Sequence, residues 1–218
     1  MATDPNALNY KAFRPIPGWS LLLFVGFCAG LVMLGLRLWP APTMLSALGI
    51  FFGAGLVAVL LSVAPLGRAA LPALGLRWVG WRYAVFGTVG TLAISIGVSQ
   101  LGIEPDGVKQ AMEIASDPEQ FLLSLLFLAV LAPLVEELVF RGLLYGWLEA
   151  RWGSSVAFVV SSLAFAAAHL EPKHVILVLP LGLLFGWLRR RSNSLAPSIV
   201  AHIVNNGFAL TASAYLGI

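Results

Sequence analysis

Apolar residues in this chain gather into long segments separated by short polar connections. Most of these segments approach the roughly 20 residues that an α-helix needs to cross the ~30 Å hydrocarbon core of a bilayer. In a membrane the backbone must satisfy its own hydrogen bonds, which favours helices. The pattern predicts seven membrane helices, at about residues 19–38, 44–64, 83–101, 120–140, 155–169, 175–188 and 195–216.

The fourth segment can be extended beyond residue 140. Pro133 removes a backbone donor, and Gly142 and Gly146 permit bending, so one long or kinked helix can run from about Phe121 to Ala150. Splitting residues 120–151 into two spans would instead raise the count to eight. The predicted fold is therefore all-α, a polytopic transmembrane helical bundle of seven or eight membrane helices.

Composition supports a membrane protein. The chain is 59% hydrophobic and 11% charged, against roughly 25% charged residues in soluble domains. We expect residues 1–18 to form a cytoplasmic N-terminal segment and 19–218 a single membrane-embedded domain. The first apolar run exceeds the 7–15 residues of a secretory signal, so it is interpreted as an uncleaved span. Cys28 is the single cysteine, which excludes an internal disulfide and a cysteine-based metal site.

The 13 Lys and Arg residues indicate orientation rather than nucleic-acid binding, since they are scattered along an apolar chain. A cytoplasmic N-terminus puts ten of them inside and three outside. We expect an integral protein of a bacterial plasma membrane with the bilayer as a partner and no nucleic acid. The acidic connection 102–119 then lies outside as a loop or amphipathic segment. The inside group is Lys11, Arg14, Arg68, Arg77, Arg82, Arg141, Arg151, Arg189, Arg190 and Arg191, and the outside group is Arg37, Lys109 and Lys173.

Two carboxylates interrupt the fourth span. A charge inside a span costs about 2.5–3.5 kcal/mol on insertion scales, so Glu136 and Glu137 are candidate functional residues. Glu137 and Arg141 are four residues apart and can pair on one helical face. Glu136 points about 100° away and remains free to face a polar cavity. The simpler interpretation is that both carboxylates end the span.

Two later spans also carry polar faces. Phe165 and His169 share one helical face, and so do His202 and Asn206, because each pair has i, i+4 spacing. Asn205 is expected to point elsewhere. Polar groups on three helices would be unpaired in hydrocarbon unless they met in a water-containing pocket. We therefore expect them to converge.

Such a pocket could hydrolyse a peptide bond. Glu136 would take a proton from water, His169 would orient that water, and His202 with Asn206 would donate hydrogen bonds to the developing oxyanion. A zinc site built from two histidines and a glutamate is the competing interpretation. The His-Glu-x-x-His motif of soluble metalloproteases is absent.

Three motifs, Glu136-Glu137-x-x-x-Arg141, Phe165-x-x-x-His169 and His202-x-x-x-Asn206, occur in this order. Together they resemble the CAAX protease and bacteriocin-processing family of intramembrane endopeptidases, over about residues 120–210. The resemblance implies a CAAX prenyl protease type of enzyme. It also implies catalytic roles for Glu136, His169, His202 and Asn206, with Glu137, Arg141 and Phe165 supporting them. The implied partner is a peptide or protein substrate, and whether that substrate is prenylated stays open. The implied mechanism uses no catalytic metal or other cofactor, with zinc as the alternative.

Other interpretations stay open at this point. A non-proteolytic immunity or scaffold protein would need the fold but not Glu136, whereas a transporter is disfavoured because no inverted pair of interrupted helices is visible. His174 is expected in a short interfacial loop, and the run Arg189–Arg191 is expected to determine topology. Seven short spans would put Glu136 and His169 at opposite depths. A longer fourth helix, a tilted or shallow fifth helix, or an eighth span would remove that conflict.

Overall fold

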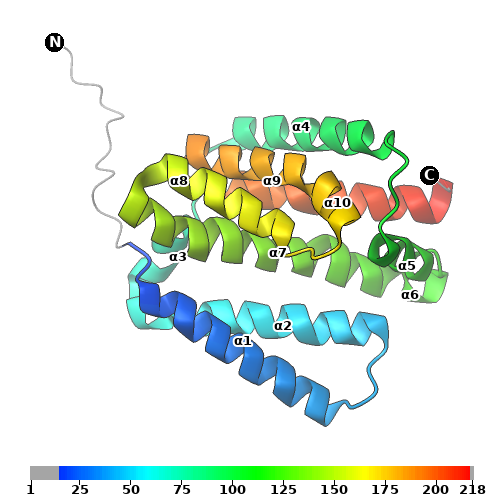
Figure 1. Ribbon diagram of the computed structural model, residues 1–218, viewed down its shortest axis with the longest axis horizontal. Coiled ribbons are helices and arrows are strands. Elements are labelled where there is room, and N and C mark those ends of the chain that lie inside the picture. The colour runs from blue at the N-terminus through cyan, green and yellow to red at the C-terminus, as the bar shows by residue number, and fades with distance from the viewer. Residues whose placement is uncertain (1–14, 217–218) are drawn as a thin grey trace.

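The computed structural model describes residues 15–216, and within this range it consists of helices and connecting loops without β-strands (Figure 1). The predicted all-α class is confirmed. The elements are α1 Gly18–Leu38, α2 Met44–Val63, the 3-10 segment η2 Ala64–Ala69, α3 Ala70–Leu74, α4 Trp81–Ser99, α5 Asp106–Ala115, α6 Pro118–Ser124, the π-helical segment η3 Leu125–Leu131, α7 Ala132–Glu137, the π-helical segment η4 Leu138–Leu144, α8 Tyr145–Ala167, α9 Pro172–Ser192 and α10 Ala196–Leu216.

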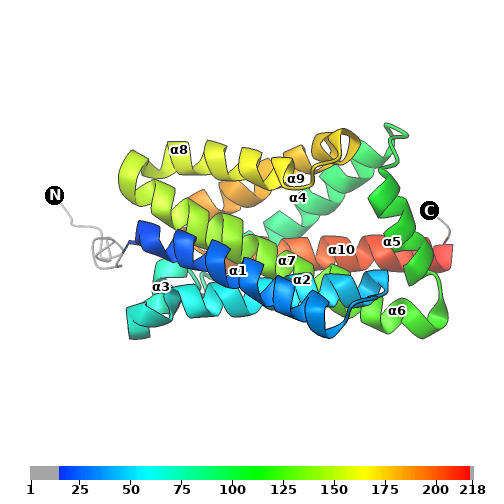
Figure 2. The same ribbon diagram turned by 60° about the horizontal axis from the view of Figure 1, so that its bottom comes forward.

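The long helices lie lengthwise beside one another in both views of the bundle (Figures 1 and 2). Five helical stretches in the described range are long and apolar enough to cross a membrane. The first, third and fifth stretches agree with predicted spans to within a few residues, whereas the second, Met44–Leu74, and the fourth, Pro118–Ala167, extend further than predicted. Lys11, Arg14 and most of the predicted N-terminal segment 1–18 lie outside the described residues, so the division at residue 18 remains a prediction.

The fourth predicted span is one long helix. It runs through α6, η3, α7, η4 and the first part of α8 from Pro118 to Trp152, and is roughly 50 Å long at 1.5 Å per residue. Gly153 ends it with φ 81° and ψ 169°, a conformation essentially restricted to glycine. The chain then reverses, and residues 154–167 return along the bundle (Figure 1). The described residues therefore contain seven long helices, not eight.

Local sequence explains several helix ends. Thr43 caps α2 by accepting a hydrogen bond from the Ser46 backbone N–H at 3.3 Å. Asp117 does the same for α6, where Pro118 occupies the first helical position. Asn193, in the left-handed conformation with φ 50°, ends α9. These signals fix the short connections that bring the helices into antiparallel contact.

Polarity is arranged as expected for a bundle in lipid. Large apolar side chains such as Leu22, Met33 and Leu122 are more than 70% exposed on the outer surface. The centre, in contrast, contains the fully buried Glu137 and Arg141. Hydrocarbon can solvate the outer side chains but not the inner ones, so the inner charges must find partners within the protein.

Candidate active site

Glu137 and Arg141 form the buried ion pair that their spacing predicts. Arg141 Nη1 lies 3.1 Å from Glu137 Oε1, and neither side chain has exposed surface. Glu136 projects to a different side of the same helix and keeps 20% of its side chain exposed. The two adjacent carboxylates thus have different environments: Glu137 is fully buried in what is called the dry ion pair below, whereas Glu136 is partly exposed.

Arg141 also joins the fourth helix to the return arm of α8 and to α9. Its Nη2 donates to the Gly182 carbonyl oxygen at 2.8 Å, and its guanidinium carbon lies 4.2 Å from the centroid of the Phe165 ring. A Cβ atom at position 182 would stand 2.9 Å from that ring. Glycine is therefore required for the close approach of α9, and this approach holds Phe165 over the ion pair.

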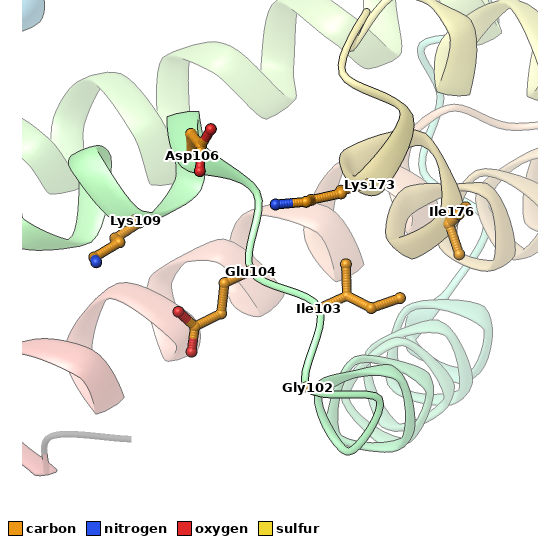
Figure 3. Close-up of a pocket in the computed structure, with 7 residues that line it drawn as sticks. All are labelled: Gly102, Ile103, Glu104, Asp106, Lys109, Lys173 and Ile176. Atoms are coloured by element: carbon orange, nitrogen blue, oxygen red, sulfur yellow. The ribbon is translucent and has the colours of Figure 1, made fainter.

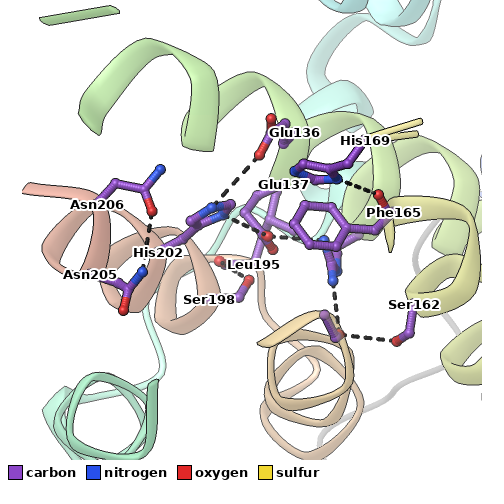
Figure 4. Close-up of polar contacts among 12 residues, drawn as sticks. Glu136, Glu137, Ser162, Phe165, His169, Leu195, Ser198, His202, Asn205 and Asn206 are labelled. Carbon is purple, nitrogen blue, oxygen red and sulfur yellow. Dashed lines mark hydrogen bonds and ion pairs between the residues drawn. The ribbon is translucent and has the colours of Figure 1, made fainter. Parts of the chain in front are cut away.

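His202 lies between the two carboxylates (Figure 4). Its Nδ1 is 3.3 Å from Glu137 Oε1, and its Nε2 is 3.7 Å from Glu136 Oε2. The imidazole stacks on Phe185 with ring centroids 4.6 Å apart. Because a carboxylate only accepts, Nδ1 donates to Glu137, and this bond orients Nε2 towards Glu136.

His169 is oriented by the main chain. Its Nδ1 lies 2.9 Å from the Phe165 carbonyl oxygen, which only accepts, so Nδ1 carries the proton and Nε2 is the acceptor of the neutral ring. In Figure 4 this second nitrogen faces Glu136. Burial lowers the pKa of His169; the Phe165 carbonyl raises it, and His202 and Arg141 lower it. The net lowering favours the neutral imidazole.

Because the fourth helix is long, Glu136 and His169 lie at similar depths along the bundle. Glu136 lies 17 residues before Gly153 and His169 lies 16 residues after it. At 1.5 Å per residue both stand roughly 25 Å from the turn, on antiparallel arms. Of the three solutions that the sequence allowed, the structure contains the longer fourth helix.

These side chains share one cavity of about 940 Å³. Most of its surface is apolar, and its lining comes from α2, α4, α5, the fourth helix, α9 and α10. The predicted convergence is therefore present in the structure. The polar residues that line the inner part of the cavity are Glu136, His169, His174, His202, Asn205 and Asn206.

Residues 118–208 match the family described as Type II CAAX prenyl endopeptidase Rce1-like. This segment, somewhat under half of the chain, is thus similar to the CAAX protease family of membrane endopeptidases. All the motif residues from Glu136 to Asn206 lie within the matched range. Together with the apolar helices and the similarity to YdiL, this match identifies the chain as an integral membrane peptidase.

Three curated proteins are similar to the chain. YdiL of Bacillus subtilis (strain 168), provisionally described as a membrane peptidase, is 24% identical over 210 residues, which cover 95% of this chain and 74% of YdiL. The membrane-embedded CAAX protease MroQ of Staphylococcus aureus (strain USA300) is 34% identical over 38% of this chain and 36% of MroQ. The UPF0177 protein YaiH of Lactococcus lactis subsp. lactis (strain IL1403) is 30% identical over 40% of this chain and 36% of YaiH. No solved structure matches the chain.

The position of Asn205 in this membrane peptidase differs from the expectation. Asn206 Nδ2 donates to the Leu128 carbonyl oxygen at 3.1 Å, which ties α10 to η3. Asn205 does not point away: its Nδ2 donates to Asn206 Oδ1 at 3.3 Å, and it lines the same cavity. The i, i+4 rule selected Asn206 but gave no signal for its neighbour.

The expected loop position of His174 is wrong. His174 belongs to the first turn of α9, its ring centroid is 4.4 Å from that of His169, and it lines the cavity. The helix starts at Pro172, a residue that is well suited to a first turn. This proline, directly after Glu171, was the sequence signal for an earlier helix start.

The three residues of the Arg189–Arg191 run differ in burial, so the run is not only a signal of membrane topology. Arg189 is 3% exposed, donates from Nε to the Arg141 carbonyl oxygen at 3.1 Å, and lies over the Tyr145 ring. Arg190 and Arg191 are exposed. Only these two are accessible to lipid head groups or solvent.

Zinc coordination requires several donor side chains around one point. The described residues contain no group of three or more His, Cys, Asp or Glu side chains placed to hold a metal ion. His169 and His202 are separated by the Phe165 ring, whose centroid is 5.0 Å from the first imidazole and 5.8 Å from the second. Chelation of the purified protein is therefore the direct test of the zinc alternative.

Proposed function

We propose that this chain is an intramembrane endopeptidase in which Glu136 and His169 activate a water molecule for attack on a peptide bond. The observation that carries the proposal is the unequal placement of the two carboxylates. Glu137 is held in the dry ion pair with Arg141, whereas Glu136 faces a cavity that it shares with His169 and His202.

Water activation requires a group that can take a proton. Glu136 has exposed surface in the cavity, and the neutral tautomer of His169 offers Nε2 as an acceptor. A water between them can donate one hydrogen bond to each group, which directs an oxygen lone pair at the substrate carbonyl carbon. The proton that Glu136 receives then passes to the leaving amine, since the same carboxyl group becomes the general acid.

The tetrahedral intermediate needs hydrogen-bond donors. A protonated His202 offers Nε2–H to the cavity while Nδ1–H remains on Glu137. This charge state balances the site, because His202 and Arg141 carry two positive charges against the two carboxylates. Asn206 Nδ2 has two hydrogens and uses one on Leu128, so the second can serve the oxyanion.

The cavity and the matched family both support a peptide substrate with an apolar part. About 940 Å³ with a largely apolar lining accommodates several peptide side chains or one lipid chain beside a peptide. The matched family and MroQ are named for CAAX proteins. Farnesylated CAAX peptides and their unmodified counterparts are therefore the first substrates to compare.

The test is cleavage by detergent-purified protein, with and without a strong chelator, read by mass spectrometry on these peptides and a mixed peptide set. Glu136→Gln should lower kcat by about 10²–10⁴-fold, the usual contribution of a general base. Glu113→Gln is the matched control, because Glu113 is an exposed carboxylate at the outer edge of the same cavity. It should cleave within a few fold of the unchanged protein.

Each alternative gives a distinct result. Activity that the chelator abolishes and zinc restores would refute the metal-free mechanism. A Glu136→Gln protein that cleaves as fast as the control would refute the assignment of the base. Biological activity that persists in Glu136→Gln without any cleavage would favour the immunity or scaffold function.

A further inference from the structure

The catalytic cavity reaches the surface at one end of the bundle. Its outer lining comes from the loop 102–105 and from α5, which includes Lys109 and Glu113, at the end where α5 and α6 lie (Figure 1). A second hollow of about 480 Å³ adjoins it there (Figure 3). The two share the lining residues Gly102, Ile103, Glu104 and Lys109, so the hollow forms a vestibule of the cavity.

The opposite end of the bundle is sealed. Arg189 is buried there and donates hydrogen bonds to the Arg141 carbonyl oxygen and to Asn193 Oδ1. Leu74, Leu188 and Leu195 around it have no exposed surface. None of these residues lines the cavity. Among residues 15–216, the cavity therefore has no lining from this arginine-rich end.

Charge distinguishes the two ends among the described residues. The sealed end carries the exposed residues Arg68, Arg82, Arg151, Arg190 and Arg191. The vestibule end carries Arg37, Lys109 and Lys173 with six carboxylates, Glu104, Asp106, Glu113, Asp117, Glu119 and Glu171. Basic residues in short loops remain on the cytoplasmic side. The vestibule accordingly lies on the extracytoplasmic side.

We propose that the substrate enters this cavity from the extracytoplasmic side, so that the peptidase cuts peptide segments exposed on that face of the membrane. This inference rests on the proposed function. It specifies the substrate as an extracytoplasmic loop or tail, with its apolar part against α2 and α4 and its polar part in the vestibule. A peptide confined to the cytoplasm has no route to Glu136.

The helix α5 is placed to control this entry. Its residues Val108, Ala111 and Met112 line the cavity, while Asp106 and Lys109 lie beside the vestibule (Figure 3). The Asp106 backbone N–H donates to Glu171 Oε1 at 3.1 Å, which links the start of α5 to the loop that follows His169. A reagent bound to α5 should therefore obstruct the path of the substrate.

The experiment uses sealed membrane vesicles of opposite orientation and a soluble peptide that cannot cross the bilayer, chosen from those cleaved in detergent. Right-side-out vesicles should cleave at least tenfold faster than inside-out vesicles, and detergent should abolish the difference. In a Cys28→Ala background, an impermeant maleimide should label Glu119→Cys in right-side-out vesicles and Arg190→Cys in inside-out vesicles. Both positions are exposed and lie at opposite ends.

A second measurement tests the path itself. Lys109→Cys in the same background should lose activity when the impermeant maleimide is added to right-side-out vesicles. It should keep its activity when intact inside-out vesicles are treated with the reagent first and are then dissolved in detergent for the assay. Faster cleavage by inside-out vesicles, or reversed labelling, would overturn the inference. Absence of cleavage in detergent would instead contradict the proposed function, so the two failures are distinguishable.

Discussion

Replacement of Arg141 by methionine removes the guanidinium that forms the fully buried ion pair with Glu137. Methionine keeps much of the side-chain length and can still pack against Phe165. The Gly182 carbonyl oxygen loses the Arg141 donor but retains the Ser162 hydroxyl at 3.0 Å. The main consequence is therefore a buried Glu137 carboxylate that has lost its guanidinium partner and keeps its contact with His202.

The magnitude follows from this loss. Breaking a buried ion pair by removing one partner costs about 3–5 kcal/mol, because an uncompensated charge remains buried. Glu137→Gln should cost a similar amount, since Arg141 would then be a buried cation bonded to one neutral carbonyl. The double variant Glu137→Gln/Arg141→Met leaves no buried charge at this pair. It should be less destabilised than the sum of the single changes by about 3 kcal/mol or more.

The assay is equilibrium unfolding in mixed micelles with increasing sodium dodecyl sulfate, combined as a double-mutant cycle. Arg190→Met is the matched control, because Arg190 is exposed and donates to Ser155 alone at 3.0 Å. Its effect should stay within about 0.5 kcal/mol. Additive effects of Arg141→Met and Glu137→Gln, to within about 1 kcal/mol, would refute the view that the pair supports the site by mutual neutralisation.

Two further predictions concern Phe165 and His169. Gly182→Ala puts a Cβ 2.9 Å from the Phe165 ring. The cost of overpacking, about 1–3 kcal/mol, should exceed the helix-propensity gain of ~1 kcal/mol, and the displaced ring should lower kcat. The control Gly97→Ala, whose Cβ would have nothing within 4 Å, should stabilise the fold and leave cleavage unchanged. Thermal unfolding and kinetics of the two variants check this, and a fully active Gly182→Ala would contradict it. Burial lowers the pKa of His169, so the unfolded chain binds more protons below pH 6.5 and the free energy of unfolding should fall as the pH drops through this range. His169→Asn should make the slope of stability against pH shallower at pH 5–6.5, and an unchanged slope would assign it to other groups.

Much of the site could be predicted because helical periodicity is local. The i, i+4 spacing of Glu137 and Arg141 was sufficient to predict their ion pair, and the cost of isolated polar groups in lipid was sufficient to predict convergence. The same reasoning could not find the Gly182 carbonyl as a second partner of Arg141. That contact depends on how closely α9 approaches, which is a property of packing between helices and not of either sequence segment alone.

The depth of the site was harder to predict for a related reason. Hydropathy identifies apolar stretches, but it does not decide where a helix of about 50 Å ends and reverses. Gly153 lies in a polar stretch with little apolar signal, and its positive φ depends on the turn that it makes. A single conformational choice at this glycine brings Glu136 and His169 to the same level.

The order of the two carboxylates explains how one short helix can support both structure and chemistry. Adjacent residues differ by about 100° around a helix axis, so Glu137 can face Arg141 in the dry interior while Glu136 faces the cavity. The dry pair fixes His202 through Nδ1, and the same imidazole then presents Nε2 to Glu136. Because His202 contacts both carboxylates, substitutions of Glu137 or Arg141 should alter both the stability of the fold and kcat. A change at the exposed outer edge of the cavity, such as Glu113→Gln, should alter neither strongly.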